Sequence, residues 1–120
     1  MDSFYDADLA KLVSYVTFDG HLAKTVRRFY LSSSEKEPLE DFEKLVRLKF
    51  GLETKREKGT GFGESTKSYV YNAVAARKLR EAGAPAGDKM LTPFRVPTWI
   101  KENPEYSRAY LAWHFNAKVG

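Results

Sequence analysis

Two hydrophobic periodicities alternate along this chain, and their order limits the folds that it can adopt. Apolar residues recur at helical spacing over 7–18, after Pro38 and after Asn72, whereas strand-forming residues occupy about 21–25, 27–33, 52–57 and 66–71. A helical pattern and an alternating pattern bury different sets of side chains, so each segment is suited to one structure. The order predicts an α+β fold in which a four-stranded antiparallel sheet has helices on one face.

Glycine and proline mark the ends of these segments. Gly20, Gly51 and Gly83 each follow a helical stretch, which is where glycine commonly ends a helix. Pro97 begins a short helical turn and Pro104 begins an extra C-terminal helix. We therefore expect a single domain over 1–120, with a core at 1–95 and a C-terminal helical segment at 96–120.

The composition predicts an intracellular protein with no membrane partner. The chain of 120 residues is 42% hydrophobic, contains no cysteine and has a net charge of +4. It has no apolar run of about 18 residues that could cross a membrane. Its acidic N-terminus is wrong for a signal peptide, so a cytoplasmic location is expected. The excess of basic residues suits a nucleic-acid partner.

Helices on one face leave the other face of the sheet open to solvent or to a partner. Since side chains alternate along a strand, burial of Phe29 would place Arg28 and Tyr30 on the open face. On the third strand either Lys55 or Arg56 would point outward, and the sequence does not decide between them. A solvated face with alternating charges is the other interpretation. The candidate nucleic-acid contacts are Lys24, Arg27, Arg28, Tyr30, Ser32, Lys55, Arg56, Lys67, Tyr69 and Tyr71.

Three stretches resemble one protein family. The segment LVSYVTFDGHL at 12–22 resembles the signature helix of LAGLIDADG homing endonucleases in the form found in archaeal inteins. Residues 27–51 are similar to the second strand and second helix of that family. Residues 92–120 resemble the segment that leads into its second signature helix. The resemblance implies an αββαββα repeat whose curved sheet lies in the major groove of DNA.

The resemblance also implies a metal site at the end of the first signature helix. Asp19 matches the position of the catalytic acid that holds magnesium, and Gly20 lets the chain turn into the first strand. An aspartate at a helix C-terminus is disfavoured by the helix dipole, which favours a functional role over simple helix ending. In the second motif Lys118 replaces the acid, and a lysine would repel the metal. That motif is therefore degenerate.

The resemblance thus implies a DNA-binding domain of the LAGLIDADG homing endonuclease type, with degenerate or impaired double-strand cleavage and double-stranded DNA as partner. One alternative is an active magnesium-dependent, site-specific endonuclease or nickase acting as a homodimer through helix 9–18. A second is an RNA-binding, maturase-like splicing cofactor, and a third is a protein-interaction domain. A C-terminal helix packed on 9–18, with Leu111, Trp113 and Phe115 buried, would compete with the dimer.

Overall fold

A computed structural model describes residues 4–58, 65–87 and 96–119, with 112–119 described by their backbone alone. The predicted α+β class with a four-stranded antiparallel sheet is confirmed. The glycine-rich turn between the last two strands and the loop before Pro97 lie mainly outside the described residues. The elements are α1 (Ala7–Phe18), β1 (Gly20–Leu22), β2 (Arg28–Ser33), α2 (Lys36–Phe50), β3 (Lys55–Lys58), β4 (Thr66–Tyr71), α3 (Ala73–Ala82), α4 (Thr98–Lys101) and α5 (Pro104–Val119).

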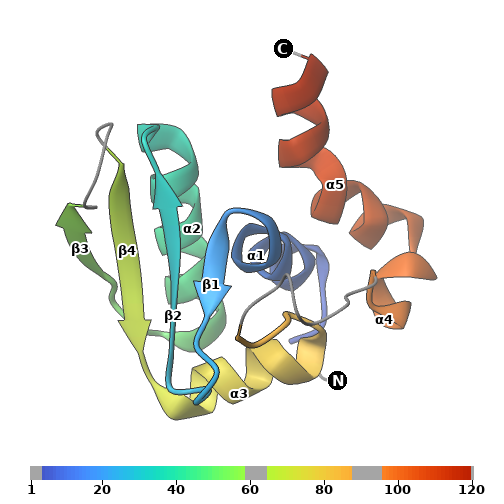
Figure 1. The fold of residues 1–120 in the computed structure, drawn as a ribbon. Coiled ribbons are helices and arrows are strands. Elements are labelled where there is room, and N and C mark those ends of the chain that lie inside the picture. Colours follow the sequence, from blue (N-terminus) through green and yellow to red (C-terminus); the bar gives the residue numbers. More distant parts are fainter. Residues whose placement is uncertain (1–3, 59–64, 88–95, 120) are drawn as a thin grey trace.

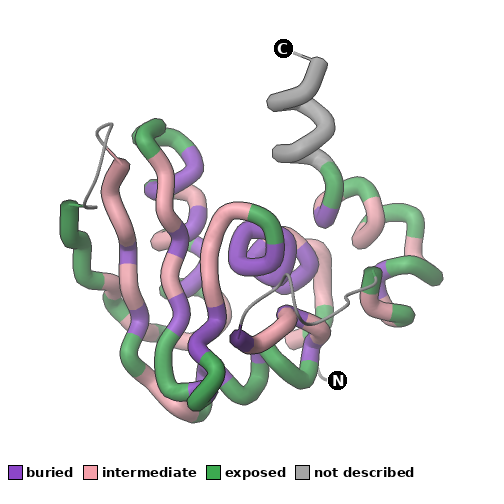
Figure 2. Tube along the Cα trace, in the orientation of Figure 1, coloured by how far each residue is buried: buried purple, intermediate pink, exposed green. Residues whose placement is uncertain are grey.

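Helix α1 forms the centre of the core. Asp6 caps its first turn, where the side chain accepts a hydrogen bond from the Leu9 N–H at 2.9 Å. Nearly every residue from Leu9 to Thr17 is buried, so α1 is covered on all sides rather than along one stripe (Figure 2). A helix that is apolar around most of its circumference can be stable only in the interior.

The sheet has the strand order β1-β2-β4-β3, and every neighbouring pair is antiparallel. Phe29, Leu31 and Val70 point to the helical layer and are buried, which confirms the predicted alternation. Figure 1 shows α2 behind the strands, α1 beside β1 and α3 across one end of the sheet. The opposite face carries no helix from the described part of the chain.

Two strands are shorter than the sequence predicts. Strand β1 ends at Leu22, because the chain then turns through residues 23–27 before β2. In that turn the Val26 N–H donates to the Ala23 carbonyl at 2.8 Å, and Val26 has a positive φ of 55°. Strand β3 begins at Lys55 rather than at 52, since Leu52 packs against the core before the strand starts.

The C-terminal helices close the far side of α1. Tyr110 on α5 is buried, and its ring lies edge-on to Phe18 with centroids 5.6 Å apart. Trp99 on α4 donates from Nε1 to the Ala82 carbonyl at 2.7 Å, which ties α4 to the end of α3. The expected packing of the C-terminal helix on 9–18 is therefore confirmed. Leu111, expected to be buried there, is instead 48% exposed. The side chains of Trp113, Phe115 and Lys118 lie outside the described residues.

This packing corrects the alternative of a homodimer through helix 9–18. The residues that such a dimer would use, including Ala10, Ser14 and Thr17, are already buried within one chain. Helix α5 lies against this helix, so a second copy would first have to displace it.

Candidate nucleic-acid interface

The open face of the sheet carries a row of aromatic rings across three strands. Tyr30 on β2 lies opposite His21 on β1 and Tyr69 on β4, and their ring centroids are 5.7 and 5.6 Å away. Tyr69 and Tyr71 lie two residues apart on β4, so both point to the open face. Their rings are nearly parallel, with an interplanar angle of 22° and centroids 5.8 Å apart. We call His21, Tyr30, Tyr69 and Tyr71 the aromatic row.

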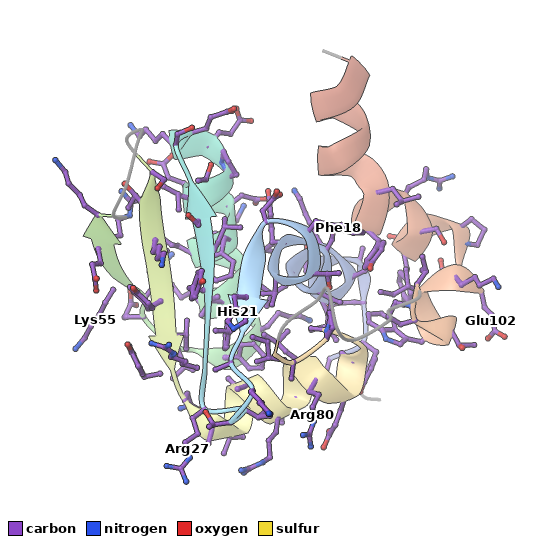
Figure 3. The ribbon with its side chains drawn as sticks, in the orientation of Figure 1. Phe18, His21, Arg27, Lys55, Arg80 and Glu102 are labelled. Atoms are coloured by element: carbon purple, nitrogen blue, oxygen red, sulfur yellow. The ribbon has the colours of Figure 1, made fainter. Side chains whose placement is uncertain are left out.

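Basic side chains lie among these rings on the same face. The Lys67 ammonium group sits 4.8 Å from the centre of the Tyr30 ring, within the range of a cation–π interaction. Arg28 lies opposite Tyr71, and its Nη1 donates to the Tyr71 hydroxyl at 3.3 Å. Lys55 lies opposite Tyr69 and is exposed at the outer edge of the sheet, as Figure 3 shows. Arg28, Lys55 and Lys67 are the face cations.

The strand register resolves the choice between Lys55 and Arg56. Arg56 lies opposite the buried Ser68 and therefore points to the helical side of the sheet. There Nε and Nη2 of Arg56 each donate to the Glu43 carboxylate at 2.8 Å. Arg56 therefore does not lie on the open face, where a ligand contact was predicted. Its side chain instead joins β3 to α2.

The remaining predicted contacts lie where the alternation places them. Ser32 shares the open face with Lys67, its partner on β4. Lys24 and Arg27 lie in the turn between β1 and β2 and are exposed, so they extend the basic surface beyond the strands. Figure 3 shows Arg27 at this end of the sheet. Whether each of these residues contacts a ligand stays a prediction.

Local contacts on the open face raise the pKa of Arg28 and of Tyr69. The hydrogen bond from Arg28 to Tyr71 raises the pKa of the Arg28 guanidinium. Loss of solvent around the Tyr69 ring raises the pKa of its phenol, and the nearby Glu57 carboxylate raises it further. The raised pKa values favour the charged form of Arg28, which suits a phosphate contact, and the neutral form of Tyr69, which suits base stacking.

Two residues of this face are absent from the predicted contacts. His21 belongs to the aromatic row because β1 pairs with β2 in a register that sets it opposite Tyr30. Glu57 lies opposite Lys67 on the open face and is its one acidic residue within the described strands. Alternation from Leu22 already indicates that His21 points outward. The position of Glu57 follows only once β3 is assigned a register.

Asp19 occupies the end of α1. Its N–H donates to the Tyr15 carbonyl at 2.9 Å, and its carbonyl accepts from the Ser32 N–H at 3.3 Å. Within the described ranges, no three His, Cys, Asp or Glu side chains cluster closely enough to suggest a metal site. The catalytic role of Asp19 and its binding of magnesium therefore stay predictions.

The fold and this surface define a class of protein. It is an α+β domain with one face of a small sheet left open and lined with tyrosines and cations. No helix within 4–58, 65–87 or 96–119 has the length and apolar character to span a membrane. The predicted cytoplasmic location stays a prediction.

Comparison with known proteins adds one relative. No family model matches the chain. The chain is 32% identical over 123 residues to the tRNA-splicing ligase RtcB of Methanopyrus kandleri. The match covers 91% of this chain but 12% of the ligase, so the chain spans about an eighth of that relative's length.

This relative corrects the predicted function. Its name is that of a ligase in tRNA splicing, whereas the sequence resemblance implied a DNA-binding domain of the homing endonuclease type with impaired cleavage. That prediction is wrong, and so is the alternative of an active endonuclease or nickase. The maturase-like alternative involves RNA, but a splicing cofactor is not a ligase.

Proposed function

We propose that this chain is an RNA-binding domain whose ligand lies across the open face of the sheet. The observation that carries the proposal is the combination of the aromatic row with the face cations on one surface. A relative that is named for an activity on tRNA supports RNA as the ligand class. In a longer RNA-joining protein, such a domain would hold the RNA rather than perform the chemistry.

The proposal follows from what RNA offers to a protein surface. Each nucleotide supplies one negative phosphate and one flat base, so it needs a cation and an apolar plane in reach of each other. On the open face these two groups alternate: Lys67 lies over Tyr30, and Arg28 is bonded to Tyr71. Cation–π contacts of this kind contribute only about 0.5–1 kcal/mol at exposed sites. A phosphate can therefore bind these cations at little cost.

The kinship with the LAGLIDADG fold is a separate proposal. Two features support it: the order of elements from α1 to α3, which follows αββαββα, and the Asp-Gly pair where α1 meets β1. Shared architecture would say nothing about activity, because one fold carries many functions. An experimental structure with a flat sheet, instead of the curved saddle of that family, would argue against the kinship.

The test of function compares the affinity for RNA with that for DNA. It also compares a variant that loses charge on the open face with one that loses the same charge elsewhere. We expect fluorescence anisotropy to show that an in vitro transcribed tRNA binds more tightly than a DNA duplex of similar charge. Affinity should fall as salt rises, because phosphate contacts release counterions. The double variant Arg28→Gln/Lys67→Gln should weaken tRNA binding by about tenfold.

A matched control separates this site from general attraction to a basic protein. Lys101 and Arg108 are exposed on α4 and α5, which lie away from the sheet (Figure 1). The variant Lys101→Gln/Arg108→Gln loses the same charge and should retain nearly full affinity. Equal losses in the two variants, or tighter binding to the DNA duplex, would overturn the proposed function.

A further inference from the structure

We infer that the RNA bound by this face is single-stranded, with an unpaired base stacked on Tyr71. The inference rests on the proposed function and names the class of RNA that the surface selects. It starts from a difference in exposure among the rings: Tyr71 is 64% exposed although Arg28 lies 5.9 Å from its ring centroid, whereas Tyr30 and Tyr69 are only partly exposed.

Tyr30 has little free surface to offer to a base. Lys67 sits over its ring at 4.8 Å, while His21 and Tyr69 lie at its edges with centroids within 5.7 Å. Tyr69 is flanked in turn by Tyr30 and by the nearly parallel ring of Tyr71. These two rings therefore support the surface rather than form its contact point.

Tyr71 is the ring at the end of the aromatic row, and its side chain is 64% exposed. A stack of flat groups that ends in water can be extended by another flat group, and a nucleotide base supplies one. Arg28 lies beside this ring: its Nη1 donates to the Tyr71 hydroxyl at 3.3 Å, and its guanidinium lies 5.9 Å from the ring centroid. The same guanidinium can contact the phosphate of a base stacked on the ring.

Exposure also argues against a purely structural role for this ring. Cross-strand aromatic pairs commonly stabilise sheets, but they do so by covering each other's surface. Such a role fits Tyr30 and Tyr69, which are only partly exposed. It fits Tyr71 poorly, since most of that side chain remains in solvent and contributes little to folding.

Only a single strand offers the faces of its bases to a ring on the protein. In an RNA duplex each base is stacked on its neighbours within the helix, so its faces are not available to a tyrosine. Sequence-reading domains built on a sheet accordingly take unpaired bases on their aromatic rings. An exposed ring beside cations is thus suited to a strand whose bases are free.

The one acid of the described face indicates where the phosphates run. Glu57 lies opposite Lys67 on the outer strand β3 and would repel a phosphate placed there. Arg28 and Lys67 lie on the two central strands. We therefore place the sugar–phosphate backbone over β2 and β4 rather than over β3.

The experiment uses two RNA probes with the same number of phosphates. One is an oligouridylate of about 10 nucleotides, which is within the site sizes of single-strand binding domains. The other is a blunt, fully paired RNA duplex. We expect the oligouridylate to bind at least tenfold more tightly, measured by anisotropy. A single 2-aminopurine in its centre should lose fluorescence on binding, because stacking quenches that base.

Three variants test the residues. Tyr71→Leu should weaken oligouridylate binding by between about fivefold and a hundredfold and should abolish the 2-aminopurine response, whereas Tyr71→Phe keeps the ring and should keep both. Glu57→Gln should strengthen binding. As a control, Leu48→Ala removes an apolar side chain of similar exposure, 61%, from α2 and should change nothing. Because Tyr71 and Leu48 are exposed, we expect each variant to fold.

The outcomes separate the two proposals. If the duplex binds as tightly as the oligouridylate, or if Tyr71→Leu binds normally, the single-strand inference is overturned while RNA binding itself stands. If neither probe nor the tRNA binds, the proposed function fails as well. Preference for the oligouridylate, lost with Tyr71→Leu and kept with Tyr71→Phe, is the result that supports the inference.

Discussion

Gly20 lets the end of helix α1 approach strand β2 more closely than any other residue would permit. A Cβ built at this position would lie 2.1 Å from the Tyr30 carbonyl oxygen and 3.2 Å from the Val16 Cα. Both contacts are with backbone, which cannot rotate out of the way as a side chain can. The sequence identifies Gly20 as a helix stop. It does not reveal this contact, because the neighbouring atom belongs to the following strand.

We therefore expect Gly20→Ala to lower the free energy of unfolding by about 1–3 kcal/mol, the usual cost of an overpacked position. Urea denaturation followed by circular dichroism measures it. Gly51→Ala is the matched control, since Gly51 also ends a helix but has no atom within 4 Å of an added Cβ. Its positive φ of 66° should still cost about 1 kcal/mol. A smaller effect at Gly20 than at Gly51 would contradict the close-contact explanation.

Among the elements, α5 shows which features the spacing of apolar residues predicts and which it does not. Its start at Pro104 and its packing on α1 follow from the sequence, but the buried side of the helix does not. Tyr106 and Tyr110 form one apolar stripe and Leu111 begins another, so either could face the core. The structure buries Tyr110, because Phe18 and the Thr17 hydroxyl lie opposite it on α1.

Replacing Tyr110 with alanine should therefore loosen the whole C-terminal helix. The loss of a buried aromatic side chain costs about 3–5 kcal/mol, which thermal unfolding would detect as a lower midpoint. Leu111→Ala changes the neighbouring residue, 48% exposed, and should shift the midpoint only slightly. If the two variants unfold alike, α5 does not pack on α1 through Tyr110.

At the scale of the whole molecule, one ion pair joins the helical layer to the sheet. Glu43 on α2 binds Arg56 on β3 at 2.8 Å and accepts from the Ser68 hydroxyl on β4 at the same distance. Hydrogen bonding to Arg56 holds the pKa of the Glu43 carboxyl below its ordinary value, and the bond from Ser68 adds to this. Ionised Glu43 thus stabilises the folded chain.

The direction of this shift predicts how stability depends on pH. Because the folded pKa is depressed, the stabilisation is complete above the unfolded pKa of about 4.3 and is lost as the pH falls through the lower, folded value. Urea denaturation at neutral and acid pH should show this loss. Glu43→Gln should reduce the difference between the two, whereas Glu40→Gln, which removes an exposed pair with Lys36 at 3.7 Å, should leave it nearly unchanged. Equal pH dependence in all three proteins would contradict the assignment.

Strands that differ in their apolar content also differ in how well the sequence predicts them. Alternation along β2 and β4 places Arg28, Tyr30 and Lys67 correctly, because one face of each strand is plainly apolar. It fails on β3, where Lys55–Lys58 are all exposed and no apolar residue indicates a direction. The activity implied by resemblance is also wrong, as the relative named for tRNA-splicing ligation indicates, because a fold by itself leaves the chemistry of a site open.

The two borders of the sheet differ in a way that affects how the protein behaves at high concentration. Leu22 on β1 forms a parallel bridge with Ala86, and its carbonyl accepts from the Gly87 N–H at 2.9 Å, so that border is already paired. The other border is β3, whose sequence Lys-Arg-Glu-Lys has a net positive charge. Two copies that met along β3 would bring like charges together. Growth into fibrils is therefore disfavoured at β1, because its edge is already paired, and at β3, because its charges repel.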